Sequence, residues 1–263
     1  MIKGYFLPCA KGNLFVSQYG QTNSQKTILL LPSIFEELNL SRAILTKQAL
    51  FLAKQGYCVY ALDYLGTGDS EQDIEQVNVA IWRDNIVTTV KWLQSKDIQS
   101  ITLWGVRFGG LMALTTLQSI ESILPVEQIL LWKPVMKGKQ FMTQFLRLKQ
   151  ANSMMQGEQK VNWRERILSG TNVEVAGYEI TADFLSSIDS LEVSKALALT
   201  CPLTWFELAS ASIPPAVLIQ TKEWDQQLLK TACFEGSAFW QIPEIFEQSQ
   251  LHLPTLNALQ GEA

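Results

Sequence analysis

The chain has 263 residues, of which 47% are hydrophobic and 17% are charged, and its formal net charge is -4. This length and apolar content are sufficient for one domain with a large buried core. The weakly acidic balance, with scattered basic residues, excludes the electrostatic pattern of a nucleic-acid-binding protein.

Residue counts also limit the chemistry. The four cysteines lie far apart without Cys-x-x-Cys spacing, and His252 is the single histidine. We therefore expect reduced, buried thiols and predict no metal site, cofactor or disulfide framework. The N-terminal stretch lacks the apolar run of a signal peptide, and no segment reaches the roughly 18 apolar residues of a membrane span. The sequence thus predicts a cytoplasmic protein, and it leaves the oligomeric state open.

The first predicted elements are strands. Residues 4–10 and 14–18 are predicted to form a hairpin that turns at Gly12 and Asn13. Residues 27–31, TILLL, are wholly apolar, as expected of a strand buried on both faces of a parallel sheet. We expect Ser41 to cap the helix that follows.

Strands and helices then alternate. The predicted order is a strand at 57–62, a helix at 79–94, a strand at 100–104, a helix at 111–120 and a strand at 128–132. After an interruption it resumes with a strand at 203–208, a helix at 215–223 and a last strand at 238–246. This alternation predicts an α/β domain built on a mostly parallel twisted sheet with helices on both faces.

The interruption covers residues 137–199. It contains helical segments at 141–155 and 181–199, and we predict no buried strand between them. We interpret it as a helical lid insertion over the carboxyl ends of the strands. The predicted core is then made of residues 1–136 and 200–263.

The most informative motif follows the strand at 100–104. Gly105-x-Arg107-x-Gly109 leads directly into a helix, as the Gly-x-Ser-x-Gly nucleophile elbow does in α/β-hydrolases. Asp63-x-x-Gly66-x-Gly68-x-Ser70 resembles a turn of the same superfamily. The sequence is thus similar to the α/β-hydrolase superfamily, but arginine stands where the nucleophile is expected, and a guanidinium is not a nucleophile.

A narrower resemblance concerns residues 32–42 (PSIFEELNLSR), 103–109 (LWGVRFG) and 131–141 (LWKPVMKGKQF). These segments resemble the second type of exosortase-A-system-associated hydrolase. The resemblance extends over most of the chain and includes the arginine elbow. It implies a link to bacterial exopolysaccharide and exosortase loci, and it implies no defined substrate.

The remaining members of a catalytic triad are poorly represented. Glu207, inside the strand at 203–208, is the nearest carboxylate to the position of the acid, and it is otherwise a polar residue at a strand end. His252 follows the last predicted strand and is either a base or a residue of the final helix. Ser33 is the best alternative nucleophile, although a serine in a loop more often bonds local backbone.

Two interpretations of Arg107 stay open. With the helix N-terminus beside it, the guanidinium could bind a carboxylate or phosphate ligand, together with Glu36, Glu37 and the elbow neighbours Val106 and Phe108. Alternatively, Arg107 forms an internal ion pair with a glutamate, which buried arginines usually require. A carboxylate side chain bound in the elbow would exclude the first interpretation.

The root of the predicted lid is basic, with lysine or arginine at 133, 137, 139, 147 and 149. This is either a solvated face or, with its interleaved apolar residues, a surface for a membrane or an anionic glycan. Three functions follow for the whole chain. It is a degenerate hydrolase-fold protein that binds a small anionic ligand or a partner, an ester or thioester hydrolase or acyl transferase with an unconventional site, or an interaction protein with a closed pocket.

Overall fold

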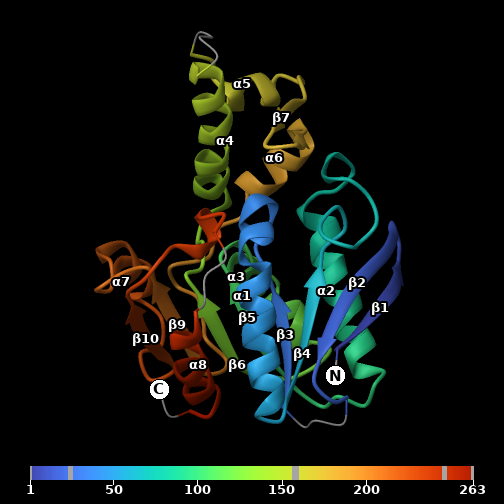
Figure 1. Ribbon diagram of the computed structural model, residues 1–263, viewed down its shortest axis with the longest axis vertical. Coiled ribbons are helices and arrows are strands. Elements are labelled where there is room, and N and C mark those ends of the chain that lie inside the picture. Colours follow the sequence, from blue (N-terminus) through green and yellow to red (C-terminus); the bar gives the residue numbers. More distant parts are fainter. Residues whose placement is uncertain (1, 23–25, 156–159, 245–247, 262–263) are drawn as a thin grey trace.

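The computed structural model describes residues 2–22, 26–155, 160–244 and 248–261. Its centre is an eight-stranded sheet with the strand order β1-β2-β4-β3-β5-β6-β9-β10 (Figure 1). The strands are β1 (Ile2–Cys9), β2 (Gly12–Tyr19), β3 (Lys26–Leu31), β4 (Tyr57–Asp63), β5 (Ile101–Val106), β6 (Val126–Trp132), β9 (Leu203–Leu208) and β10 (Leu229–Phe234). The pairs β1–β2 and β2–β4 are antiparallel, and all the other pairs are parallel.

Helices cover both faces of the sheet. One face carries α2 (Val79–Gln94) and α3 (Phe108–Glu121), and the other carries α1 (Phe35–Lys54) and α8 (His252–Leu259). The helix α7 (Pro215–Thr221) connects β9 to β10, and three short 3-10 helices are η1 (Ile74–Gln76), η2 (Phe239–Gln241) and η3 (Ser249–Leu251). This arrangement confirms the predicted α/β architecture with a mostly parallel sheet.

The apolar sequence of strand β3 reflects the layers of helices on both faces of the sheet. Successive side chains of a strand point to opposite faces. Leu29 and Leu31 therefore join the larger core, beneath α2 and α3, whereas Ile28 and Leu30 join the smaller core, beneath α1 and α8. Both faces are buried because each has its own layer of helices, and the sequence of such a strand is continuously apolar.

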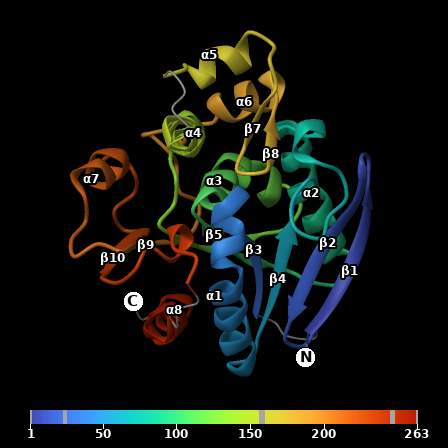
Figure 2. The ribbon, with the colours of Figure 1, turned by 45° about the horizontal axis from the view of Figure 1, so that its top comes forward.

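A group of elements stands above the carboxyl ends of the strands (Figures 1 and 2). We call it the upper segment, and it consists of α4 (Gly138–Met155), α5 (Trp163–Leu168), the hairpin β7 (Val173–Val175) and β8 (Tyr178–Ile180), and α6 (Ala182–Asp189). Its Phe184 ring packs against Phe35 and Trp82 of the body, with centroids 5.9 and 5.4 Å apart. Aromatic contacts thus join the upper segment to the sheet layer.

Five predictions about the elements were wrong. The first hairpin turns at Ala10 and Lys11, since Cys9 pairs with Gly12. Ser41 does not cap α1, because the helix begins at Phe35 and the Ser41 hydroxyl donates to the Glu37 carbonyl.

The other three errors lie in the second half of the chain. The strand-free stretch of the predicted lid contains the β7–β8 hairpin, and the helix predicted from 181 ends at Asp189. The last strand is Leu229–Phe234 instead of 238–246, a range that includes a 3-10 helix and residues 245 and 246, which lie outside the described residues. Because β10 is an edge strand, its sequence LKTACF lacks a continuous apolar run.

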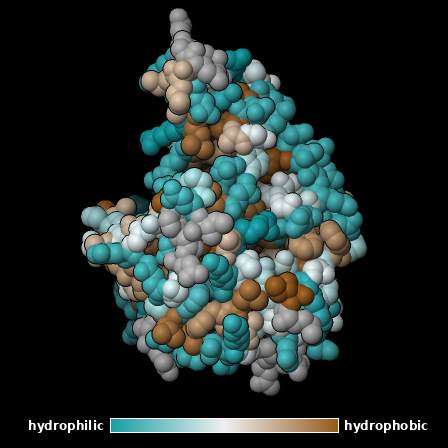
Figure 3. Space-filling model, viewed as in Figure 1, coloured by the Kyte–Doolittle hydropathy of each residue, from teal (hydrophilic) through white to brown (hydrophobic). Residues whose placement is uncertain are grey.

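The surface in Figure 3 is largely hydrophilic, with hydrophobic patches on the helices of the upper segment. None of the helices in the described parts of the chain combines the length and apolar content that crossing a bilayer requires.

Candidate functional site

Arg107 occupies the sharp turn between β5 and α3. Its backbone has φ 52° and ψ -118°, which is unusual for a residue with a Cβ atom. The turn is held by hydrogen bonds from the Arg107 amide to the Trp132 carbonyl, at 3.0 Å, and from the Val135 amide to the Arg107 carbonyl, at 3.1 Å. The strained strand-to-helix geometry of a nucleophile elbow is therefore present although its nucleophile is not.

The glycines that flank Arg107 are required by close backbone contacts. A Cβ atom on Gly109 would lie 1.8 Å from the Leu31 carbonyl oxygen. A Cβ atom on Gly105 would lie 2.6 Å from the Cα atom of Gly110. These contacts explain why the elbow has glycines at both positions.

The Arg107 guanidinium is bound by the carboxylate of Glu37, from the first turn of α1. Arg107 Nη2 donates to Glu37 Oε1 at 2.8 Å, and Nε lies 3.2 Å from both carboxylate oxygens. Nη1 donates to the Lys133 carbonyl at 3.1 Å, and the Trp240 ring covers the guanidinium with its centroid 4.9 Å from Cζ. The two charged side chains are only 8% and 16% exposed, so this is a largely buried ion pair.

Ser33 completes this network. Its hydroxyl donates to Glu37 Oε2 at 2.6 Å, and the residue is fully buried in the loop between β3 and α1. The structure thus brings together Ser33, Glu37 and Arg107. Glu36, the next carboxylate, accepts a long 3.4 Å bond from Asn39.

Glu207 lies beside the elbow, on β9, and is also paired. Its carboxylate accepts from Lys133 Nζ and, at 3.0 Å, from the indole nitrogen of Trp205. Lys133 itself has φ 45° and immediately follows β6. The carboxylate predicted as a triad acid therefore binds a lysine.

His252 is placed away from the elbow. Its ring stacks on Phe51 of α1, with centroids 4.6 Å apart. Phe51 follows Glu37 by 14 residues in α1, which corresponds to roughly 21 Å along the helix axis. The structure does not bring His252 together with Arg107 or Ser33.

Two cavities lie under the upper segment, on either side of Phe141 and Gln144 of α4. The first has a volume of about 320 Å³ and includes Lys133, Lys137 and Glu207 in its wall, with Arg107 at its edge. The second has a volume of about 410 Å³, and its wall is mainly aromatic and aliphatic: Ile34, Phe35, Leu40, Phe141, Phe145, Leu148, Trp240 and Pro243, with Glu36, Glu37, Gln144 and Gln241. A basic and an apolar cavity thus meet at the elbow.

Comparison with known proteins agrees with this geometry. The alpha/beta hydrolase fold family matches residues 26–125, which is less than half of the chain. No curated protein sequence matches the chain. Many solved structures are similar over nearly its whole length.

Three of these structures illustrate the similarity. Est1E from Butyrivibrio proteoclasticus, solved with ferulic acid, has a TM-score of 0.68 at 15% identity and covers 98% of this chain and 96% of its own. Mouse alpha/beta hydrolase domain-containing protein 10 has a TM-score of 0.64 at 17% identity, with 99% of each chain covered. The thioesterase domain of the curacin biosynthetic pathway has a TM-score of 0.59 at 16% identity and covers 99% and 98%.

This chain has the α/β-hydrolase fold. The assignment confirms the predicted fold, and the part of the chain that the family model matches includes the β3 strand and the elbow. The similarities lie between 15% and 17% identity and therefore concern the fold alone.

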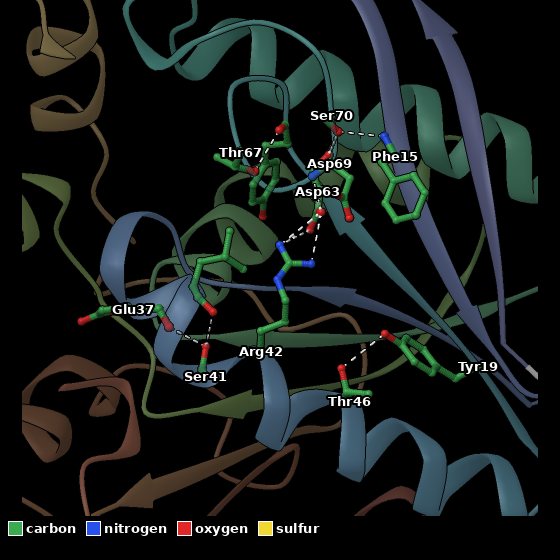
Figure 4. Close-up of polar contacts among 12 residues, drawn as sticks. Phe15, Tyr19, Glu37, Ser41, Arg42, Thr46, Asp63, Thr67, Asp69 and Ser70 are labelled. Atoms are coloured by element: carbon green, nitrogen blue, oxygen red, sulfur yellow. Dashed lines mark hydrogen bonds and ion pairs between the residues drawn. The ribbon is translucent and has the colours of Figure 1, made fainter. Parts of the chain in front are cut away.

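The motif Asp63-x-x-Gly66-x-Gly68-x-Ser70 forms a turn after β4 (Figure 4). Arg42 donates to both Asp63 carboxylate oxygens at 3.2 to 3.3 Å, and the Asp69 amide donates to Asp63 Oδ2 at 3.0 Å. A Cβ atom on Gly68 would lie 2.0 Å from Asp63 Oδ2. Burial raises the pKa of the Asp63 carboxyl, in opposition to Arg42. Ser70 bonds the Asp63 carbonyl, so this motif is structural.

Some predicted ligand-binding residues lie within the cores of the hydrolase fold. Val106 and Phe108 are fully buried on opposite faces of the sheet, and neither borders the two cavities. In contrast, Trp240 and Lys133 were not predicted as site residues, although both contact Arg107. Lys133 could have been suspected from its place after a buried strand, whereas Trp240 has no comparable signal in the sequence.

Within the described ranges, no three His, Cys, Asp or Glu side chains are grouped so that they could hold a metal ion.

Proposed function

We propose that this α/β-hydrolase-fold protein binds a small amphipathic anion in the two cavities beside the elbow and does not hydrolyse it. The observation that carries the proposal is the Arg107–Glu37 ion pair, which occupies the place of the nucleophile. An arginine at this place cannot form a covalent intermediate. The carboxylate bound in the elbow also argues against Arg107 as the ligand-binding cation.

The alternative nucleophile Ser33 is poorly placed for catalysis. Its hydroxyl contacts Glu37, a possible base, at 2.6 Å, which is the one observation in favour of an unconventional hydrolase. However, Ser33 is fully buried and Glu37 is held by Arg107. A substrate carbonyl has no access to the buried hydroxyl, and the Glu37 carboxylate is already occupied by the guanidinium.

The cavity walls indicate the chemical class of the ligand. The apolar cavity has the size and composition of small-molecule sites, and the rings of Phe35 and Phe145 stack 4.0 Å apart in its wall. The adjoining cavity supplies Lys133, which is paired with Glu207, and Lys137, which is half exposed and paired with the equally exposed Glu192, so that a ligand anion would compete with Glu192 for it. An aromatic or acyl body carrying a carboxylate, phosphate or sulfonate would place its apolar part in the first and its charge in the second.

The biological setting of this proposal rests on the narrower resemblance. The segments at 32–42, 103–109 and 131–141 are similar to exosortase-associated hydrolases. We infer that the ligand, or a partner that delivers it, belongs to exopolysaccharide or exosortase metabolism in the cytoplasm. An interaction protein without a ligand is the alternative, and the binding assay below decides between them.

Catalysis is tested with short-chain aryl esters and acyl thioesters. We expect wild type, Arg107→Ala, Ser33→Ala and His252→Ala to release product at the rate of a sample without protein. Turnover by the wild type that Ser33→Ala abolishes would show an active enzyme with an unconventional nucleophile, and the proposal would be wrong.

Binding is tested with two fluorescent probes, the anion 8-anilinonaphthalene-1-sulfonate and the neutral N-phenyl-1-naphthylamine. Phe145→Ser should weaken both probes, since it removes an aromatic wall of the apolar cavity. Lys137→Ala should weaken the anion alone. Leu218→Ser, on the exposed face of α7, is the control. If neither Phe145→Ser nor Lys137→Ala changes the affinity for the probes, the proposal is contradicted. If the wild type binds neither probe, the alternative of an interaction protein without a ligand is favoured.

A further inference from the structure

The far end of the upper segment exposes apolar side chains. Met154 and Met155, at the end of α4, are 64% and 87% exposed, and Leu168, at the end of α5, is 48% exposed. Figure 1 shows the ends of α4 and α5 at the top of the molecule, at the greatest distance from the sheet. Exposed large apolar side chains gathered at one end of a protein indicate an interaction surface.

The same end carries a concentration of positive charge. Residues 138–170 include six lysines and arginines and two glutamates, a net charge of +4. Since the whole chain has a net charge of -4, the other residues together carry -8. Five of these six cations lie on α4 and α5, whereas residues 171–189 of the upper segment add four acidic residues and no cation.

Trp163 connects the charged and apolar features. Lys149 and Arg166 lie over its ring, with 5.5 and 5.6 Å from the charged groups to the centroid. The indole nitrogen is buried and has no hydrogen-bond partner among the described residues, so only the ring and its cations can reach a partner. A tryptophan with neighbouring cations and exposed methionines is the composition of segments that lie in the headgroup region of a bilayer.

We propose that this end of the upper segment docks on an anionic phospholipid bilayer. The docking surface consists of Met154, Met155, Trp163, Leu168 and the cations Arg147, Lys149 and Arg166. The methionines and the leucine enter the headgroup layer, while the cations bind lipid phosphates. The acidic body is repelled by the same lipids and stays turned to the solvent.

The position of the surface brings the apolar cavity near the bilayer. Leu148 of α4 belongs to the wall of that cavity and is itself 44% exposed. Phe141, Phe145, Leu148 and Met155 follow the three- and four-residue spacing of one helix face. One face of α4 thus runs from the cavity to the exposed end. Docking does not depend on the cavity ligand proposed above, and it can be tested without one.

The test is flotation of the full chain with vesicles of phosphatidylcholine alone or mixed with phosphatidylglycerol. We expect binding to the mixed vesicles only, with a decrease as salt increases. Met154→Ser/Met155→Ser should reduce this binding. Arg147→Glu/Arg166→Glu should reduce it on the order of 25-fold, because each basic residue near an anionic surface contributes about fivefold.

Matched controls use residues distant from the surface. Leu218→Ser/Ile219→Ser changes two exposed apolar residues of α7, and Lys54→Glu/Lys91→Glu reverses two exposed cations of α1 and α2. Both should bind vesicles as the wild type does. Equal losses in control and surface variants, or no binding to anionic vesicles, would overturn the proposal.

A soluble anionic polysaccharide, polygalacturonate, separates lipid binding from general polyanion binding. We expect it to compete weakly with vesicles. If it binds as tightly as the mixed vesicles and Met154→Ser/Met155→Ser has no effect on either, the surface recognises an anionic glycan and the membrane proposal fails. The probe assay of the preceding section contains no vesicles, so its outcome is independent.

Discussion

Removal of the Glu37 carboxylate is the sharpest perturbation of the elbow. In Glu37→Ala, Arg107 loses its contacts to both carboxylate oxygens and keeps the Lys133 carbonyl and the Trp240 ring. Because the arginine side chain is only 8% exposed, water replaces those contacts poorly. Removing one partner of a buried ion pair lowers the free energy of unfolding by about 3–5 kcal/mol. Because Glu37 is partly exposed, we expect the lower value, about 3 kcal/mol.

The magnitude can be checked by urea unfolding and by a double-mutant cycle. For a chain of this size, about 3 kcal/mol corresponds to a decrease in Tm of roughly 6–12 °C. Glu37→Leu/Arg107→Met replaces both charges by apolar groups of similar size, and it should cost about 1 kcal/mol or less. A loss below about 1 kcal/mol in Glu37→Ala would refute the reasoning, because that is the value of a solvated surface pair.

The same variant also tests why Arg107 is not a ligand-binding cation in the wild type. Once Glu37 is removed, acetate can take the place of its carboxylate. Sodium acetate should therefore raise the Tm of Glu37→Ala above that in sodium chloride of equal ionic strength. The wild type should respond to both salts equally. An acetate-specific rise in the wild type would show an accessible guanidinium.

Two further predictions concern the fold around the site. Gly109→Ala should prevent soluble expression or lower the Tm strongly, because its Cβ would meet the Leu31 carbonyl oxygen at 1.8 Å. Gly170→Ala has nothing within 4 Å of its Cβ and carries only the backbone strain of its φ of 98°, so it should remain soluble with a smaller decrease in Tm. Equal losses in the two variants would contradict the packing argument. Burial raises the pKa of Asp63 above 3.8, so its contribution to stability is fully present below pH 3.8 and is lost as pH rises through the raised pKa. The free energy of unfolding, measured in urea between about pH 4 and 7, should decrease in the wild type and not in Asp63→Asn. The same pH dependence of this free energy in both proteins would contradict the prediction.

The sequence predicted the buried strands well because a parallel sheet covered on both faces leaves a local signal. Residues 27–31 and 203–208 are continuously apolar or nearly so, and both proved to be central strands. The strand β10 lacks this signal, because an edge strand has one neighbour and half-exposed side chains. The prediction therefore shifted the last strand toward Phe239 and Trp240, which form a 3-10 helix.

The candidate site was predictable only in part. The glycines around Arg107 determine a backbone turn, and such a requirement is local and visible in the sequence. The partner of Arg107 is not local, because Glu36 and Glu37 are adjacent and only the start of α1 at Phe35 directs the second toward the elbow. The sequence left His252 as either a base or a residue of the final helix, and it begins α8. Its position after the last strand is typical of a catalytic base, but the chain first crosses to the α1 face of the sheet.

The smaller core has a consequence for synthesis on the ribosome. It is formed by side chains of β3, β5 and β6, including Trp104 and Trp132, and it is closed by Phe239, Trp240 and the residues of α8. Since translation proceeds from the N-terminus, α1 can cover its part of this face early, whereas the part that Phe239, Trp240 and α8 close stays open until residues 239–259 have emerged. During this interval an indole-rich face is available to chaperones or to another nascent chain.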